Sequence, residues 1–327
     1  MATEDKRKAL VPCVPAGADD AACMRAFVEQ FGRRALRRTL TSAEIDAFAS
    51  LQTFGVEAGN FYKGVELAIA AMLQHPSFLY LVELGRPVEG KPDTFRLQPF
   101  EVAARLSYFL WGTTPDDTLL DAAQHGGLDT AEQVRAHAER MLQDPRAEKR
   151  IERFHALWLG YHQLPHAPEL VDAMQAETNA LVRKAVQPGA DYFELFKAEE
   201  TYVTDALAQH YGLSKPPGPA AWIGYGATKR KGILSHGAVL SAFAKKGDTS
   251  PTQRGLFIRE RLLCQKIPPP PPEVNADDTP ESELGPCKEQ RYSAHASVGS
   301  CKACHAMMDP IGFGLENYDK AGRFRTH

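Results

Sequence analysis

Apolar residues recur at helical spacing along most of this chain, and this pattern constrains the fold more than any other feature. The segment that includes Val65, Ile69 and Met72 is a clear case, because these side chains would line one face of a helix that runs to about Gln74. Few segments alternate between apolar and polar residues as strands do, and no repeat with a period of about 20 to 50 residues is evident. We therefore expect a mainly α protein.

Several helix starts are indicated by capping residues. Thr41 with Glu44 and Thr130 with Gln133 have the spacing of capping boxes. Pro99 suits the first turn of a further helix, where its missing N–H costs nothing. Each of these signals precedes a run of apolar residues at helical spacing, so each predicts a helix.

The clearest start is Ser250-Pro251-Thr252-Gln253, which combines a cap, a proline at the first helical position and a glutamine at the third. It predicts a helix that runs to about Lys266. Tyr202 and Leu207 suit one face of another helix, which should stop at Gly212.

The chain has 327 residues, of which 43% are hydrophobic, so it is long enough for two or three domains with cores of their own. Linker-like segments predict an N-terminal helical module over 1–90, a central helical module over 91–226 and a C-terminal module over 227–327. In the last module, Pro268–Pro272 would form a rigid polyproline strut, and Glu273–Leu284 would form an exposed loop.

The net charge of −3 gives no broad positive field for nucleic acid. The longest apolar stretch, Val65–Leu84, is interrupted by polar residues and proline, so we expect no transmembrane span. Residues 1–12 lack the apolar core of a secretory signal. A basic cluster is interpreted as a solvated helix face and consists of Arg33, Arg34, Arg37 and Arg38.

Near the C-terminus, Cys301-Lys302-Ala303-Cys304-His305 has the Cys-x-x-Cys-His spacing of a c-type haem attachment site. Two cysteines three residues apart lie on adjacent positions of one helical turn, so both sulfurs can reach the vinyl groups on one porphyrin edge. The histidine that follows can supply the proximal nitrogen to the iron. The motif predicts one covalent haem c, bound by Cys301 and Cys304, with His305 as iron ligand.

Two other interpretations stay open. Cys301 and Cys304 could join Cys264, Cys287 or His305 in a zinc site, or they could form a redox dithiol. Zinc sites usually combine two compact ligand pairs, and a thioredoxin-type dithiol expects a strand-rich context that the sequence lacks. Haem is therefore favoured over both.

The remaining four of the six cysteines fall into two pairs by their spacing. Cys13 and Cys23 are ten residues apart, and Cys264 and Cys287 are 23 apart. Either pair could close a disulfide in an oxidising compartment, although spacing does not fix the connectivity.

The sequence that follows the haem motif is Met308-Asp309-Pro310-Ile311-Gly312-Phe313-Gly314-Leu315-Glu316-Asn317-Tyr318-Asp319-Lys320-Ala321-Gly322-Arg323. With the motif, it resembles the haem-binding segment of planctomycete-type cytochrome-c-associated proteins of unknown function. The resemblance continues upstream in Thr249-Ser250-Pro251, Arg254-Gly255, Pro268–Pro272, Leu106-Ser107-Tyr108-Phe109-Leu110-Trp111, Pro115-Asp116-Asp117, Phe31-Gly32-Arg33-Arg34-Ala35 and Arg37-Arg38.

This resemblance covers nearly the whole chain and implies three consecutive family modules. Relatives usually carry an export signal and continue on both sides of this span. We therefore expect the chain to belong to a longer protein that is periplasmic or extracellular.

Residues after the motif are candidates to contact the haem. Pro310 is expected to end the haem-bearing helix, and Phe313 to cover an edge of the macrocycle. Arg323 could pair with a propionate. Met308 belongs to the same segment, but it is too close to His305 to reach the opposite face of the iron, since three extended residues span only ~10 Å. Further candidates are Arg325 for a propionate, Glu316 or Asp319 to hold the arginine, and Gly312 and Gly314 for close approach to the macrocycle.

The ligand on the opposite face of the iron decides the function. His295 and His236 are the nearest candidates in sequence, and each can equally be a structural histidine. A six-coordinate iron would indicate electron transfer with a redox partner protein or a linked domain. A five-coordinate iron would indicate a haem-dependent oxidoreductase of the peroxidase or oxygenase type. A third hypothesis is a non-enzymatic interaction module.

Overall fold

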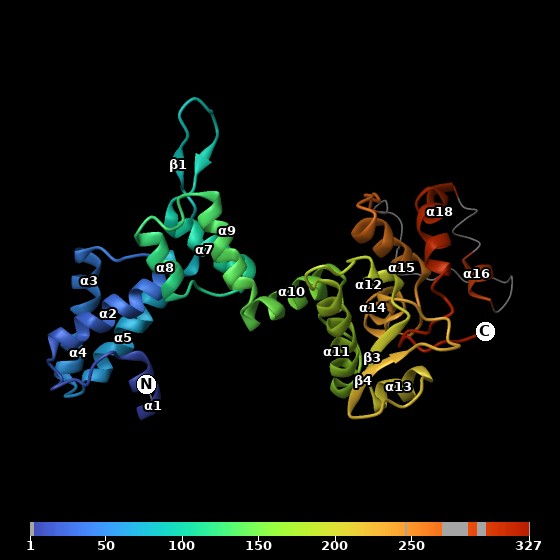
Figure 1. The fold of residues 1–327 in the computed structure, drawn as a ribbon, viewed down its shortest axis with the longest axis horizontal. Coiled ribbons are helices and arrows are strands. Elements are labelled where there is room, and N and C mark those ends of the chain that lie inside the picture. Colours follow the sequence, from blue (N-terminus) through green and yellow to red (C-terminus); the bar gives the residue numbers. More distant parts are fainter. Residues whose placement is uncertain (1–2, 246, 270–286, 293–298, 327) are drawn as a thin grey trace. The chain divides into compact units, whose positions relative to one another are not determined.

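A computed structural model of the chain describes residues 3–245, 247–269, 287–292 and 299–326. The described residues are mainly helical, which confirms the predicted fold class (Figure 1). By internal packing the chain divides into two compact units, Met1–Arg150 and Ile151–His327. The three-module division at 1–90, 91–226 and 227–327 stays a prediction.

The first unit is a set of helices with one small two-stranded sheet. Its elements are α1 (Glu4–Leu10), α2 (Ala21–Leu36), α3 (Ser42–Ala49), α4 (Gln52–Glu57), α5 (Phe61–Gln74), α6 (Pro76–Leu79), β1 (Arg86–Pro87), β2 (Phe95–Arg96), α7 (Pro99–Leu110), α8 (Asp117–Gln124) and α9 (Ala131–Leu142). Helix α10 (Pro145–Trp158) follows and contains the division between the units.

The predicted caps form as expected in this unit. Thr41 and Glu44 make the capping box of α3, and Thr130 and Gln133 make that of α9. Pro99 occupies the first turn of α7. Helix α5 begins at Phe61, four residues before the apolar run that predicted it, because Asn60 accepts a hydrogen bond from the Tyr62 amide and caps the helix there.

A disulfide between Cys13 and Cys23 ties the N-terminal segment to α2. It lies beside a core in which Phe27 and Met24 of α2 pack against Val65 of α5. The prediction that these two cysteines can pair is confirmed.

The basic cluster on and after α2 is a solvated face only in part, because Arg34 is exposed whereas Arg37 is buried. Arg33 and Arg34 reach α8, where they pair with Asp121 and Asp117 at 2.6 Å each. Arg37 is buried and donates to backbone carbonyls, including that of Tyr80 at 3.0 Å. The arginines therefore connect segments that are far apart in sequence, which helical periodicity alone does not reveal.

The second unit adds a longer sheet to a helical core. Its elements after α10 are α11 (Pro168–Ala185), α12 (Glu194–Lys197), β3 (Glu200–Thr204), α13 (Asp205–Tyr211), β4 (Ala220–Gly224), the 3-10 turn η1 (Ile233–Ser235), α14 (Gly237–Ala242), α15 (Pro251–Phe257), the π-helical turn η2 (Ile258–Leu262), α16 (Lys288–Arg291) and α18 (Gly299–Phe313). None of the described helices is long and apolar enough to cross a membrane.

Two predictions in this unit need correction. Tyr202 lies in β3, antiparallel to β4, and not in a helix, because Glu200–Thr204 alternates in burial and is rich in residues that favour strands. Thr204 then caps α13, which ends before Gly212 as expected. The helix that begins after Ser250 continues only to Leu262, through α15 and η2.

The polyproline strut and the loop after it mostly lie outside the described residues. The structure describes Pro268 and Pro269 but not residues 270–286.

A fully buried polar network holds the centre of the second unit. Glu177 of α11 accepts hydrogen bonds from Thr201 and Tyr211, both at 2.7 Å. His236 lies 3.7 Å from the same carboxylate. Burial raises the pKa of Glu177 to about 7, although both hydrogen bonds oppose the shift. Burial also lowers the pKa of His236 to about 3.

We predict that Glu177→Gln removes a pH dependence of stability. Because the folded-state pKa of Glu177 is raised, its stabilising contribution is present below about pH 4.5 and is lost as the pH rises through about 7. The free energy of unfolding of the variant minus that of wild type should therefore increase with pH. Between about pH 5 and pH 8 the increase should be on the order of 3 kcal/mol.

Urea denaturation across this pH range measures the difference. Glu199→Gln is the control, since the Glu199 side chain is 84% exposed. If the free energy of unfolding changed with pH by the same amount in the two variants, the prediction would be contradicted.

Candidate functional site

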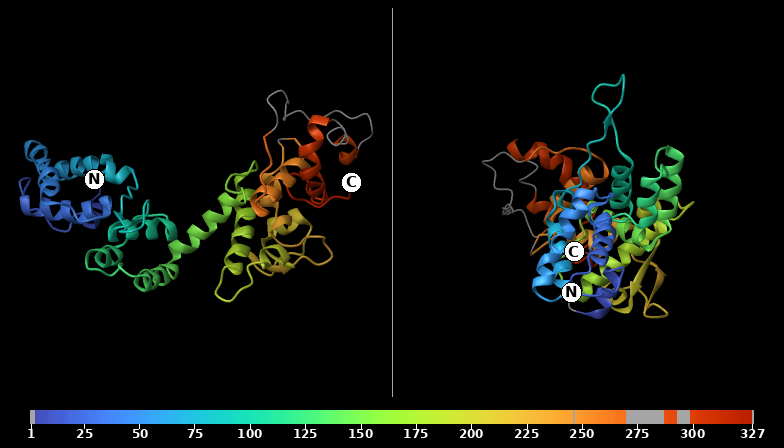
Figure 2. Two further views of the ribbon diagram at one scale, coloured as in Figure 1. Left: turned by 90° about the horizontal axis from the view of Figure 1, so that it is seen from above. Right: turned by 90° about the vertical axis from the view of Figure 1, so that its left-hand side faces the viewer.

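Helices α15 and α18 lie side by side in the second unit, as Figures 1 and 2 both show. Two glycines bring their backbones together. A Cβ atom at Gly255 would lie 1.9 Å from the Met308 carbonyl oxygen, and one at Gly312 would lie 1.8 Å from that of Pro251. No side chain fits at either place, so α18 can dock only where both positions are glycine.

Gly312 was expected to allow close approach to a macrocycle. In the structure Gly312 packs against α15, and its approach to a macrocycle stays a prediction. The Ser250-Pro251 cap and the Arg254-Gly255 pair also gain a structural role, because they form the surface that receives α18.

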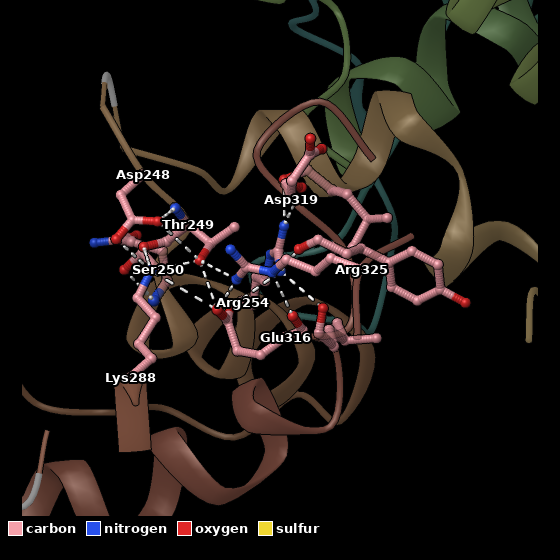
Figure 3. Close-up of polar contacts among 12 residues, drawn as sticks. Asp248, Thr249, Ser250, Arg254, Lys288, Glu316, Asp319 and Arg325 are labelled. Atoms are coloured by element: carbon pink, nitrogen blue, oxygen red, sulfur yellow. Dashed lines mark hydrogen bonds and ion pairs between the residues drawn. The ribbon is translucent and has the colours of Figure 1, made fainter. Parts of the chain in front are cut away.

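Arg254 fixes the chain that follows α18 (Figure 3). Its side chain is 1% exposed and donates to the backbone carbonyls of Leu315, Tyr318 and Asp319, at 2.8 to 3.0 Å. The Glu316 carboxylate lies 3.0 Å away and balances the charge. Burial lowers the pKa of Arg254, while Glu316 acts in the opposite direction. One buried guanidinium thus closes the turn after α18 on α15.

Glu316 also holds the last segment in place. Arg325 contacts it at 2.8 Å, and Thr249 donates to it at 2.5 Å. Lys288 of α16 approaches the same carboxylate at 3.7 Å and pairs with Asp248 at 2.8 Å (Figure 3). The interpretation that Glu316 would hold an arginine is therefore right for Arg325, and Arg254 is a second partner that the sequence did not indicate.

The residues of the Cys-x-x-Cys-His motif all lie in α18. Cys301, Cys304 and His305 are half-buried, and neither cysteine is in a disulfide. Their helical conformation places the two cysteines on adjacent positions of one turn, as the spacing predicts.

The imidazole of His305 is oriented by a carboxylate. Its Nδ1 lies 2.9 Å from Oδ2 of Asp309, one turn further along α18, and the two side chains are 20% and 9% exposed. Oδ1 of the same carboxylate accepts a hydrogen bond from Thr252 of α15 at 2.8 Å. With Nδ1 directed at Asp309, coordination of a metal falls to Nε2.

The possible metal ligands named in the sequence analysis are the thiols of Cys264, Cys287, Cys301 and Cys304 and the imidazole of His305. Among the residues the structure describes, no group of three or more His, Cys, Asp or Glu side chains is arranged to hold a single metal ion. Cys264 and Cys287 are exposed and not disulfide-bonded.

The other predicted haem contacts are dispersed along the end of the chain. Pro310 lies inside α18, which continues to Phe313, so the expectation that Pro310 ends the helix was wrong. Met308 is buried with its backbone against Gly255. Phe313 packs edge-on against Tyr292. Arg323 is exposed, and its Nε donates to His210 at 3.3 Å.

Of the two candidate ligands for the opposite face of the iron, the structure describes only His236. His295 lies outside the described residues. His236 is fully buried, and both of its ring nitrogens have protein partners: Nδ1 contacts Thr178 and Nε2 contacts Tyr225, each at 3.1 Å. These are the surroundings of a structural histidine.

Comparison with family models places three matches along the chain. Residues 23–83 match PSD5, a protein of unknown function (DUF1595); residues 97–213 match PSD4, a protein of unknown function (DUF1592); and residues 230–327 match PSCyt3, a protein of unknown function (DUF1588). The chain is built of three consecutive modules of these planctomycete cytochrome-c-associated families. No curated protein and no solved structure matches it.

Helices α15 and α18 both belong to the PSCyt3 match, and so do Arg254, Asp309 and the cysteine motif. The module thus contains the whole docking surface and the oriented histidine. Asp309 and Thr252 are the functional candidates that sequence reasoning missed. The spacing of Asp309, four residues after His305, could have revealed the first, whereas Thr252 is brought in by tertiary packing.

We predict that Gly312→Ala disrupts the docking of α18. The added methyl group would overlap the Pro251 carbonyl, which is backbone and cannot rotate away. We expect a loss of about 3 kcal/mol or more in the free energy of unfolding. Hydrogen exchange of α18 amides in the full chain should accelerate accordingly.

Gly218→Ala is the matched control, because a Cβ there meets no atom within 4 Å. Protection of α18 in the Gly312 variant equal to that in the control would show that the close approach is not needed.

Proposed function

We propose that the PSCyt3 module binds one haem c covalently and that the protein acts in electron transfer. The observation that carries the proposal is the arrangement of Cys301, Cys304 and His305 on one helix, α18. The thiols are not in disulfides, and the nitrogen that faces away from Asp309 is the one that an iron ligand uses. The family name PSCyt3 is in keeping with a cytochrome association.

Each residue has a defined task in this proposal. Cys301 and Cys304 would hold the haem by addition of their thiols across its two vinyl groups, and His305 would ligate the iron through Nε2. A c-type haem supplies a one-electron Fe(III)/Fe(II) couple. We propose that Phe313 contacts an edge of the macrocycle and that Arg323 pairs with a propionate. Met308 and Pro310, like Phe313, lie in α18 and are further proposed contacts of the haem.

The proposed location is the periplasm or the extracellular space. The Cys13–Cys23 disulfide supports it, because disulfides persist in oxidising compartments. The electron partner is proposed to be a separate protein or a linked domain, since a single haem passes one electron at a time.

We predict that covalent haem depends on the motif cysteines alone. The double variant Cys301→Ser, Cys304→Ser, exported with haem-maturation machinery, should lose the haem that wild type retains on a denaturing gel. Cys264→Ser and Cys287→Ser are matched controls, because both thiols are exposed and lie outside the motif.

The increase in mass from haem should be present in wild type and in both controls, and absent from the double variant. Covalent haem on the double variant, or none on wild type, would refute the proposal.

A haem-dependent oxidoreductase of the peroxidase or oxygenase type is the second candidate. The Asp309–His305 pair favours it, because a carboxylate behind the proximal histidine makes that histidine a stronger donor and so suits chemistry at an open position. Electron transfer would instead be favoured by a second protein ligand that keeps small molecules off the iron.

Spectra of the purified, haem-loaded chain separate the two candidates. For electron transfer we expect a low-spin ferrous spectrum that carbon monoxide does not change. A high-spin ferrous spectrum that shifts on addition of carbon monoxide would instead support the oxidoreductase.

A further inference from the structure

We propose that Asp309 is a positioning residue that lowers the reduction potential of the haem bound through His305. This inference rests on the proposed function, since it concerns the same histidine. Its basis is the contact between Nδ1 of His305 and Oδ2 of Asp309, at 2.9 Å. Neither the family models nor the cysteine motif assigns a role to this aspartate.

The carboxylate is held in one orientation from two sides. Asp309 follows His305 by four residues, so both side chains lie on the same face of α18. On the other side, Thr252 donates to Oδ1 at 2.8 Å. Oδ1 of the carboxylate accepts a hydrogen bond from the threonine of α15, and Oδ2 faces the imidazole.

The position of Thr252 is itself fixed by the fold. It lies in the first turn of α15, between the Ser250 cap and Gly255. The close approach of α15 and α18 at Gly255 and Gly312 sets the distance between Thr252 and Asp309. The helix packing therefore orients the carboxylate, and the carboxylate orients the imidazole.

Burial makes this contact effective. The Asp309 side chain is only 9% exposed, so water does not screen it as it would screen an ion pair on the surface. A carboxylate that accepts a hydrogen bond from Nδ1–H increases the electron density at Nε2 and strengthens its bond to a metal. A stronger donor stabilises ferric iron more than ferrous iron. The carboxylate should therefore lower the reduction potential of the haem.

The test is Asp309→Asn in the exported, haem-loaded full chain. Asparagine keeps the shape and can still accept a hydrogen bond, but it lacks the charge. At a fixed ambient potential in a spectroelectrochemical titration, we expect the ferrous-to-ferric ratio to rise at least tenfold over wild type. A tenfold change corresponds to about 59 mV for a one-electron couple.

A second measurement distinguishes positioning from a structural role. Infrared difference spectra between the reduced and oxidised forms should contain a carboxylate band and histidine ring modes in wild type. The carboxylate band should vanish in Asp309→Asn, and the ring modes should shift.

Glu260→Gln is the charge-matched control. Glu260 is exposed in η2, and its substitution removes the same charge from a turn whose Arg259 donates to the Met307 carbonyl of α18 at 2.6 Å. It should leave the infrared bands at their wild-type positions and change the ratio by less than Asp309→Asn does. Equal effects of the two substitutions on the ratio would overturn the inference.

Thr252 gives an independent test if Asp309→Asn does not accept haem. Thr252→Ser keeps the hydroxyl and should retain the wild-type ratio and infrared bands, whereas Thr252→Val should change both. Wild-type values in Thr252→Val would overturn the inference while the haem proposal stands. Absence of covalent haem from wild type would instead overturn the proposed function.

Discussion

The second unit depends on the contact between the backbones of α15 and α18. Gly255 faces the Met308 carbonyl and Gly312 faces that of Pro251, with no room for a Cβ atom at either position. This approach brings Thr252 within hydrogen-bond distance of Asp309 and places Arg254 under the turn after α18. The orientation of His305 thus follows from packing between helices more than from the motif that contains it.

Arg254 and Asp309 have different roles in this module. Arg254 donates to the carbonyls of Leu315, Tyr318 and Asp319, so it fixes the chain after α18. The helix itself is positioned by the glycine contacts with α15. Asp309 faces the motif and acts on His305. Both charges are almost fully buried and have protein partners, which is the condition under which buried charges are tolerated.

The sequence predicted local features well and long-range features poorly. The caps at Thr41 and Thr130 form as predicted because they involve residues three apart. The strand at Tyr202 was missed because a short strand with helical neighbours gives little periodic signal. Partners far apart in sequence, such as Arg254 with Glu316, leave no spacing pattern. The sequence therefore indicated the motif residues but not the tertiary contacts that hold them in place.

The most direct measurement is a crystal structure of the exported, haem-loaded chain. The account predicts thioether bonds at Cys301 and Cys304, Nε2 of His305 on the iron, and Nδ1 of His305 within hydrogen-bond distance of the Asp309 carboxylate. Iron bound through Nδ1, or an Asp309 carboxylate directed away from the imidazole, would contradict it.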